Sequence, residues 1–291
     1  CFIWWNNKNL IDLITNITEK YFKGNSSAFD VSVQFKLSLQ SLLDRPKELL
    51  ELINNCLKPQ EIEKKKFGEV FTPMELVNEM LDKLPKEVWT NKNLKWLDPA
   101  VGMGNFMIAV YLRLMESLTS VPEKDRKMYI LEKMLYSCEI NKKNIIIYKQ
   151  IFDINNEYKL NIHEGDFLEY TPDIKFDLII GNPPYQKENK KTGAARGGIG
   201  NNLYLDFVIK SISLLNTNGY LLFIHPLNWR KINSKIFKEF INRNIIYMKL
   251  NYGSEFFNNV SVKTDYYVLK NSADDNYKTR IECNTKNGII S

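Results

Sequence analysis

From residue 94 onward, short apolar runs alternate with longer stretches of helical periodicity in this 291-residue chain. The apolar runs occupy residues 94–97, 135–138, 160–163, 176–180, 220–224 and 245–250. Helical spacing of apolar residues is found at 104–118, 123–134, 141–152, 201–215 and 232–242. This alternation predicts βαβ units, in which a parallel sheet carries helices on both faces. A last run at 260–269, rich in β-branched and aromatic residues, is predicted to pair antiparallel with the strand before it.

Residues 1–62 show another pattern, in which leucine and isoleucine recur at helical spacing and Pro46 marks a break. We predict a helical N-terminal extension there. The charged run at 61–67 that follows is typical of a solvated helix face or a linker. The sequence thus divides into an extension over residues 1–62, an α/β domain over 63–270 and a tail over 271–291.

The composition is that of a globular protein with a sizeable core, with 44% hydrophobic and 25% charged residues. The net charge of +6 permits a polyanionic partner without demanding one. Four cysteines lie far apart without zinc-ligand spacing, so neither a disulfide framework nor a metal site is predicted. No apolar run reaches the roughly 20 residues of a membrane span, and the N-terminus lacks signal-peptide features. We therefore expect an intracellular, cytoplasmic protein with no membrane partner.

A strand, a tight turn and a helix are predicted around residues 94–118, with Gly102 and Gly104 in the turn. Glycines let the backbone approach a ligand closely, and the following helix N-terminus offers unpaired N–H donors. Met107 stands where the dinucleotide fingerprint has its third glycine, which favours a cofactor with no pyrophosphate to cradle. Asp98, at the strand end, is placed to accept a hydrogen bond from an ammonium group or from water.

Acidic residues also end the next two predicted strands. Glu139 is well placed to bind both hydroxyls of a ribose, and Asp166 to accept from an adenine amino group with Phe167 beside the ring. Carboxylates at three successive strand ends lie on one edge of a parallel sheet. Together with the glycine turn, they predict an adenosine-containing ligand that carries a positive charge.

The most distinctive segment, Asn182-Pro183-Pro184-Tyr185, directly follows a predicted strand. Two consecutive prolines remove two N–H donors and stiffen the turn, which is therefore rich in acceptors. The Asn182 side-chain oxygen and the Pro183 carbonyl can each accept one N–H of a planar amino group, and Tyr185 can stack on the attached ring. The amino nitrogen is then left with its lone pair aimed at an electrophile.

Three segments in this order resemble the motifs of S-adenosylmethionine-dependent N6-adenine DNA methyltransferases, in the group whose cofactor motifs precede the catalytic one. They are Phe-Gly-Glu-Val-Phe-Thr-Pro at 67–73, Asp-Pro-Ala-Val-Gly-Met-Gly-Asn-Phe at 98–106 and Asn-Pro-Pro-Tyr at 182–185. Val101 and Met103 depart from the small residue or serine that is common in this family, but both glycines are kept. The resemblance implies S-adenosyl-L-methionine as the cofactor. The matching cofactor residues are Phe71, Thr72, Pro73, Asp98, Pro99, Ala100, Gly102, Gly104, Asn105, Glu139, Asp166 and Phe167.

The resemblance also implies an α/β, Rossmann-like methyltransferase fold whose mostly parallel sheet has seven strands, the last of them antiparallel. It covers about residues 67–270, so the domain over 63–270 is interpreted as the catalytic domain. The tail over 271–291 is either a simple tail or the start of a target-recognition region, because it is too short to be that whole region.

An aromatic residue that stacks against an extruded base is implied near the end of the resemblance. Phe257 is the first choice and Phe256 the second, and the alternative is that both are core residues of the last strands. Phe257 joins Asn182, Pro183, Pro184 and Tyr185 in the implied catalytic set. The glycine-rich segment 186–202 carries four basic residues that either contact DNA phosphates or form a solvated loop. These residues are Lys187, Lys190, Lys191 and Arg196.

The implied activity is methylation of the N6 amino group of adenine in double-stranded DNA by base flipping, within a restriction-modification system. Implied partners besides DNA are a specificity subunit, a nuclease subunit or a C-terminal recognition domain. One alternative is methylation of the side-chain amide of glutamine in a protein, since Asn-Pro-Pro-Tyr grips that planar group equally well. The segment at 67–73, the basic segment and Phe257 favour DNA over this alternative. A second alternative, a non-catalytic nucleic-acid-binding subunit, is opposed by the intact set of motifs.

Overall fold

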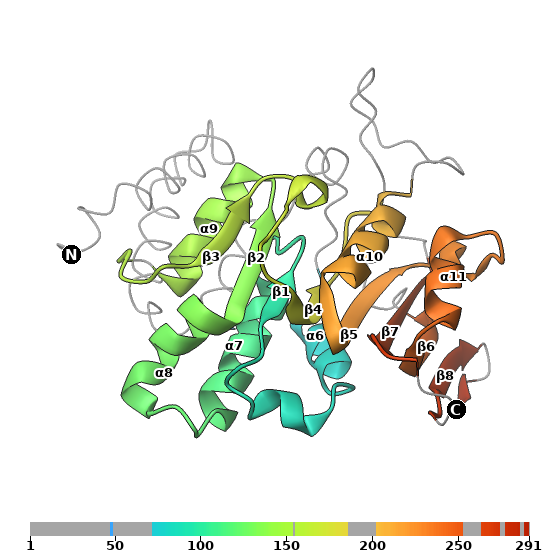
Figure 1. Ribbon diagram of the computed structural model, residues 1–291, viewed down its shortest axis with the longest axis horizontal. Helices are drawn as coiled ribbons and strands as arrows, with labels where there is room; N and C mark the ends of the chain where they lie inside the picture. Colours follow the sequence, from blue (N-terminus) through green and yellow to red (C-terminus); the bar gives the residue numbers. More distant parts are fainter. Residues whose placement is uncertain are drawn as a thin grey trace, which may run out of the picture.

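The computed structural model describes residues 47–48, 72–153, 155–185, 202–252, 263–273, 277–285 and 288–290. The predicted N-terminal extension lies outside these residues apart from 47 and 48. Helices and strands are labelled as in Figure 1. In the part of the chain that is described, no helix is long and apolar enough to cross a membrane.

One sheet holds the nine described strands, in the order β3-β2-β1-β4-β5-β7-β6-β8-β9 (Figure 1). The strands are β1 (Trp96–Asp98), β2 (Leu135–Glu139), β3 (Asn161–Glu164), β4 (Phe176–Gly181), β5 (Leu215–Pro226), β6 (Asn244–Tyr252), β7 (Thr264–Lys270), β8 (Arg280–Thr285) and β9 (Gly288–Ile290). Strands β1 to β5 are parallel, and β7 runs antiparallel to both β5 and β6. The mostly parallel sheet is confirmed, as is the antiparallel pairing of the last predicted run with the strand before it.

Among the residues that the structure describes, the sheet has nine strands rather than the seven that were predicted, because the predicted tail adds β8 and β9 beyond β6. Strand β8 pairs parallel with β6, and β9 pairs antiparallel with β8. The side chains of β8 invert the usual pattern, since Glu282 is buried whereas Ile281 is 47% exposed. A strand that buries a charged residue and exposes an apolar one lacks the alternation by which strands are recognised.

Helices cover both faces of the sheet, as predicted. The first face carries α6 (Met74–Leu81), α7 (Asn105–Ser117) and α9 (Lys142–Phe152), and the second carries α10 (Leu203–Leu214) and α11 (Lys235–Ile241). Helix α8 (Glu123–Tyr129) continues through a π-helical turn, η2 (Ile130–Met134), into β2. Short 3-10 helices are η1 (Lys86–Trp89), η3 (Phe167–Glu169) and η4 (Leu227–Arg230). Neighbouring strand residues alternate between the two cores, so Trp96 packs in the first and Leu97 in the second.

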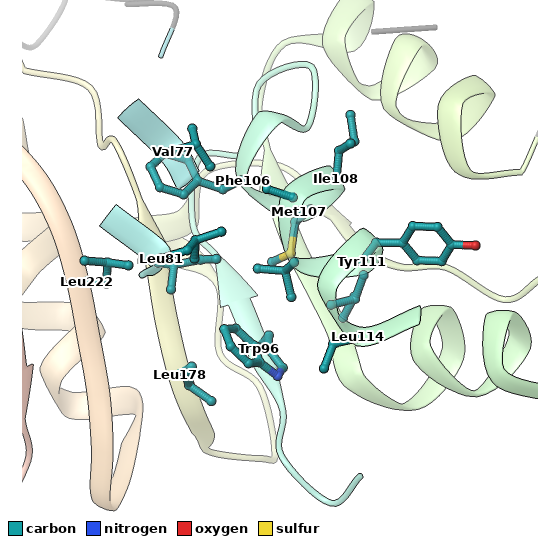
Figure 2. Packing of buried hydrophobic residues seen from close by; sticks show 14 of the residues in the cluster. Val77, Leu81, Trp96, Phe106, Met107, Ile108, Tyr111, Leu114, Leu178 and Leu222 are labelled. Atoms are coloured by element: carbon teal, nitrogen blue, oxygen red, sulfur yellow. The ribbon is translucent and has the colours of Figure 1, made fainter. Parts of the chain in front are cut away.

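Helix α6 is absent from the elements that the sequence predicts, yet it is central to the first face. Figure 2 shows Val77 and Leu81 of α6 beside Phe106 of α7, in the same cluster as Leu178 of β4 and Leu222 of β5. Pro73 precedes the helix in an extended conformation and suits a helix start, where a missing N–H is tolerated. This packing holds the start of α6, and with it Thr72, against the body of the sheet.

Candidate active site

The residues predicted to bind the cofactor and the substrate follow the carboxyl ends of the parallel strands. Strand β1 ends at Asp98 and β2 at Glu139, while Asp166 follows β3 and Asn182 follows β4. These strands are neighbours in the sheet and run in one direction, so their ends meet at one edge. The predicted grouping of the three carboxylates at one edge is confirmed, whereas their contacts with a ligand stay predictions.

The turn between β1 and α7 depends on glycine at two positions. Gly102 has φ of 55° and Gly104 has φ of 105°, and positive φ values are unfavourable for residues that carry a Cβ atom. A Cβ atom on Gly102 would meet no atom within 4 Å, so this turn borders open space. A Cβ on Gly104 would instead lie 3.1 Å from Cδ2 of Tyr148. Gly102 thus leaves room for a ligand, and Gly104 is required by the packing of α7 against α9.

Glu139 ties the glycine turn to the neighbouring strands. Its Oε2 accepts from the Gly102 N–H at 2.8 Å, and its Oε1 accepts from the Asn141 N–H at 2.7 Å. Its backbone carbonyl accepts from the Gly165 N–H at 2.9 Å. Because each carboxylate oxygen can accept a second hydrogen bond, this arrangement is compatible with binding two ribose hydroxyls.

Asp98 is a fully buried carboxylate at the end of β1, with 1% of its surface exposed. Burial raises the pKa of Asp98 to about 8; the Ala100 N–H that donates to Oδ1 at 3.0 Å lowers it, and the nearby Glu139 raises it. No ion pair to Asp98 is formed within the described ranges. A cationic ligand would stabilise the ionised form of such a group. The site therefore fits a cofactor that is positively charged.

The backbone directly before Asn182 lies against Asp98, because the residue there is Gly181. A Cβ atom on Gly181 would be 2.8 Å from Oδ1 of Asp98, so only glycine allows the end of β4 to approach β1 this closely. The Asn182 Nδ2 donates to the Thr72 hydroxyl at 3.1 Å, and the Asn105 Nδ2 donates to the Thr72 carbonyl at 2.7 Å. Thr72 thus joins the first turn of α7 to the side chain of Asn182, and brings together three of the predicted segments.

The two prolines after Asn182 lead into a turn that is anchored to α10. Pro183 is buried, and Pro184 and Tyr185 are half-buried. The Tyr185 carbonyl accepts from the Leu203 N–H at 3.2 Å. Burial raises the pKa of Tyr185 above its usual value. The turn is therefore held at both of its ends.

Asp166 and Phe167 differ in how much they offer to a ligand. The half-buried Asp166 accepts from the Leu168 N–H at 2.9 Å and so caps η3. Phe167 is buried in the second core, with its ring centroid 5.0 Å from that of Phe207. Lys210 Nζ lies 5.3 Å from the same ring. Most of the Phe167 ring is thus engaged in the core, and its contact with an adenine ring stays a prediction.

Ile140 was not among the predicted site residues. It directly follows Glu139 and is 58% exposed, so it presents an apolar side chain to solvent next to the end of β2.

Several predicted site residues lie outside the described residues, and their roles stay predictions. They are Phe71, Lys187, Lys190, Lys191, Arg196, Phe256 and Phe257. The remaining cofactor residues of the glycine segment, Pro99, Ala100 and Asn105, are in place in the turn and the first turn of α7. No group of three or more potential metal ligands occurs among the residues that the structure describes.

The fold is that of the S-adenosylmethionine-dependent methyltransferases. A Listeria monocytogenes protein described as a class I S-adenosylmethionine-dependent methyltransferase is similar with a TM-score of 0.62 and 16% identity, over 97% of this chain and 88% of that chain. The EcoKI M protein of a type I restriction enzyme is similar with a TM-score of 0.54 and 15% identity, over 97% of this chain and 65% of that chain.

The chain belongs to the Eco57I restriction-modification methylase family, which it matches over residues 104–260, more than half of its length. An uncharacterised adenine-specific methylase of Mycoplasma pneumoniae is 28% identical over 65% of this chain and 60% of that protein. The type II methyltransferase M.VspI of a Vibrio species is 26% identical over 83% of this chain and 61% of that protein. The chain thus spans about three fifths of the length of these two relatives.

Proposed function

We propose that this protein transfers a methyl group from S-adenosyl-L-methionine to the N6 amino group of adenine in DNA. The observation that carries this proposal is that Asn182 donates to Thr72 and directly follows Gly181, which lies against Asp98 at the same edge of the sheet. A site for a cationic cofactor and a site for a planar amino group then adjoin each other. Membership of a restriction-modification methylase family and the adenine-specific relative support the same substrate.

The cofactor site is assigned residue by residue from the chemistry of the strand ends. Asp98 would face a cationic part of the cofactor, since its buried carboxylate lacks a positive neighbour in the described ranges. Glu139 would bind the ribose hydroxyls, and Asp166 the adenine amino group. Ile140 offers an exposed apolar surface for the adenine ring. When bound, the cofactor supplies an electrophilic methyl group on a sulfonium sulfur.

The amino group of the substrate would be held by acceptors of the Asn182 turn. The N6 atom inside a duplex is paired, so the nucleotide must be extruded into the site. Asn182 Oδ1 and the Pro183 carbonyl then each accept one N6–H, and the hydrogen bond from Asn182 Nδ2 to Thr72 fixes the plane of the amide. With its two protons held by these acceptors, the N6 atom would keep its lone pair directed at the cofactor site, where the bound cofactor would supply the methyl group. Orientation and electrostatics supply most of the rate enhancement.

Stacking would offset the free energy of extruding the base, at about 1–3 kcal/mol per stacked base. Tyr185 is proposed for one face of the base and Phe257 for another. Lys187, Lys190, Lys191 and Arg196 are proposed to contact phosphates, which makes binding salt-sensitive. Recognition of a DNA sequence is assigned to a further domain or a specificity subunit, with a nuclease subunit as a further partner in a restriction-modification system.

The test is transfer of labelled methyl from S-adenosyl-L-methionine to duplex DNA, RNA and a protein extract, followed by nucleoside and amino-acid analysis. The expected product is N6-methyladenine in the DNA fraction. Label on glutamine in protein, or on RNA alone, would overturn the proposal. The Asn182→Ala variant serves as the control for contaminating methyltransferases.

A further inference from the structure

A buried polar cluster joins α6 to β6 and β7 on the first face of the sheet. The carboxylate of Glu79 accepts from Lys249 Nζ at 2.5 Å, from the Tyr252 hydroxyl at 2.5 Å and from the Tyr266 hydroxyl at 2.6 Å. The Lys249 side chain is 7% exposed, and its Nζ lies 3.7 Å from the centroid of the Tyr252 ring. Burial raises the pKa of Glu79, but these three hydrogen bonds outweigh it and hold the pKa below its usual value. The carboxylate is therefore ionised at neutral pH.

The cluster lies close to the same edge of the sheet as Asn182. Tyr252 is the last residue of β6 and pairs with Thr264, the first residue of β7, whose hydroxyl donates to the Tyr252 carbonyl. Strand β6 runs in the same direction as β4 and β5, because β7 is antiparallel to both β5 and β6. Glu79 thus contacts the ends of the two strands that residues 253–263 connect.

Helix α6 connects this cluster to the candidate active site. Glu79 is the sixth residue of α6, about 7.5 Å along the helix axis from Met74 at a rise of 1.5 Å per residue. Thr72 directly precedes Pro73, the extended residue at the start of this helix. The Pro73 carbonyl accepts from the Val77 N–H at 3.0 Å, so the helical bonding extends back to the residue after Thr72. Thr72 in turn accepts from the side chains of Asn182 and Asn105. A single short helix therefore carries Glu79 in its second turn, and Pro73 at its start connects it to Thr72, the partner of Asn182.

We propose that Glu79 is a positioning residue for methyl transfer, which fixes α6 against β6 and β7 and thereby sets the place of Thr72 and the orientation of the Asn182 amide. This inference rests on the proposed function. Glu79 contacts neither of the two asparagines, and its effect is transmitted through the helix. Small misplacements of a reacting group lower rates steeply, by about 100-fold for 1 Å. A carboxylate with a purely structural role would change stability without changing the state of Asn182.

The experiment compares Glu79→Gln with a matched control on the same helix. The glutamine side chain has nearly the same volume but one acceptor oxygen, so it cannot accept from all three donors in the same way. The control is Asp82→Asn, which removes an ion pair of 2.8 Å between the end of α6 and Arg113 of α7. Three quantities are measured in the full chain: the single-turnover rate of methyl transfer, the Kd of S-adenosyl-L-methionine, and the side-chain amide NMR signal of Asn182. The signal is assigned by its loss in Asn182→Ala.

Glu79→Gln is expected to lower the single-turnover rate by about 10-fold or more and to shift the Asn182 amide signal, with the cofactor Kd changed by less than about twofold. Asp82→Asn is expected to leave all three quantities unchanged. A rate and a signal equal to those of the unmodified chain, with only a lower Tm, would overturn the positioning role.

The positioning role of Glu79 can still be tested if Glu79→Gln does not fold or if the chain methylates no adenine. If Glu79→Gln does not fold, Tyr252→Phe removes one of the three hydrogen bonds without changing a charge, and the same shift of smaller size is expected. If the unmodified chain methylates no adenine, the proposed function fails, and the Asn182 signal alone decides whether Glu79 positions that side chain.

Discussion

The two halves of the sheet edge contain buried carboxylates in opposite electrostatic settings. In the first half, which comprises the ends of β1 to β4, Asp98 is fully buried beside Glu139. Its pKa is about 8, because burial raises it and a backbone N–H compensates only in part. Without a bound cation, Asp98 therefore carries a proton at neutral pH.

In the second half, which comprises the carboxyl ends of β5 and β6 and the start of β7, Asp265 is equally buried but is surrounded by donors. It accepts from Trp229 Nε1 at 2.9 Å, from Arg230 Nε at 2.8 Å and from the Asn251 N–H at 2.9 Å. The Arg230 guanidinium also forms an ion pair with it. The carboxylate of Asp265 has its cation within the chain and supports structure, whereas the proposed function assigns a cationic ligand to Asp98.

The largest expected effect belongs to Asn182→Ala in the first half. Removing an acceptor that acts on the reacting amino group should lower the rate of methyl transfer by at least about 100-fold. The cofactor Kd should change by less than about threefold, because Asn182 is assigned to the substrate and not to the cofactor. Single-turnover kinetics and isothermal titration calorimetry measure the two quantities. A variant with the rate of the unmodified chain would refute the assignment of Asn182.

The next largest expected effect is a loss of stability on substitution of Asp265, in the second half of the sheet edge. Asp265→Asn should lower the free energy of unfolding by about 2–4 kcal/mol, since it weakens several hydrogen bonds to a buried carboxylate and leaves Arg230 without its counter-charge. The cofactor Kd should stay unchanged. Thermal and urea denaturation provide the measurement.

Glu239→Gln is a suitable control for this variant. It removes the ion pair between Glu239 of α11 and Arg243, four residues further along the chain, and pairs at this spacing contribute about 0.3–0.5 kcal/mol. If Asp265→Asn weakened the cofactor as strongly as a substitution of Asp98, the proposed division between the two halves would be wrong.

Asp98→Asn should have the opposite profile to Asp265→Asn. At pH 8 the cofactor Kd should rise by about 10-fold to 100-fold, because the variant has no charge to offer a cationic ligand. Without cofactor, the variant should be at least as stable as the unmodified chain at pH 8. The folded-state pKa of Asp98 lies above its ordinary value of 3.8, so ionisation in the folded protein is unfavourable and its stability falls as pH rises towards 8.

The same carboxyl predicts a pH dependence of cofactor binding. Below pH 8 the free protein carries a proton on Asp98, and a cationic cofactor favours the ionised form, so binding must release that proton. Affinity should therefore rise between pH 6 and pH 8, by up to about tenfold per pH unit. Calorimetry in two buffers of different ionisation enthalpy detects the proton. Asp98→Asn should bind without this slope, and an equal slope in the variant would assign the proton to another group.

The first half of the edge could be anticipated from the sequence, and most of the second half could not. Asp98, Glu139 and Asn182 each follow an apolar run, and parallel strands bring their carboxyl ends together by topology alone. Glu79 meets Lys249 and Tyr266 across 170 or more residues of chain, and no local pattern signals such a contact.

Helix α6 and strand β8 show why local sequence patterns were insufficient to predict every element of the fold. Helix α6 has only eight residues, too few for its period to stand out, although it determines where Thr72 lies. Strand β8 buries Glu282 and exposes Ile281, so its polar pattern is the reverse of that of a half-buried strand. In both cases the element is specified by the surface it packs against.

The smallest expected effect tests where the cofactor lies in the first half of the sheet edge. Gly102→Ala should lower the free energy of unfolding by about 1–2 kcal/mol, because φ of 55° is unfavourable for alanine. The added methyl group would meet no protein atom within 4 Å, so any further effect must come from a bound molecule. Gly104→Ala is the matched control, since its methyl would press on Tyr148 at 3.1 Å and should destabilise the fold more. If the cofactor lies against the turn, Gly102→Ala should raise its Kd severalfold in titrations at a temperature where both variants are folded. An unchanged Kd for Gly102→Ala would move the cofactor away from this turn, while leaving the Asp98 predictions to be judged by their own pH profile.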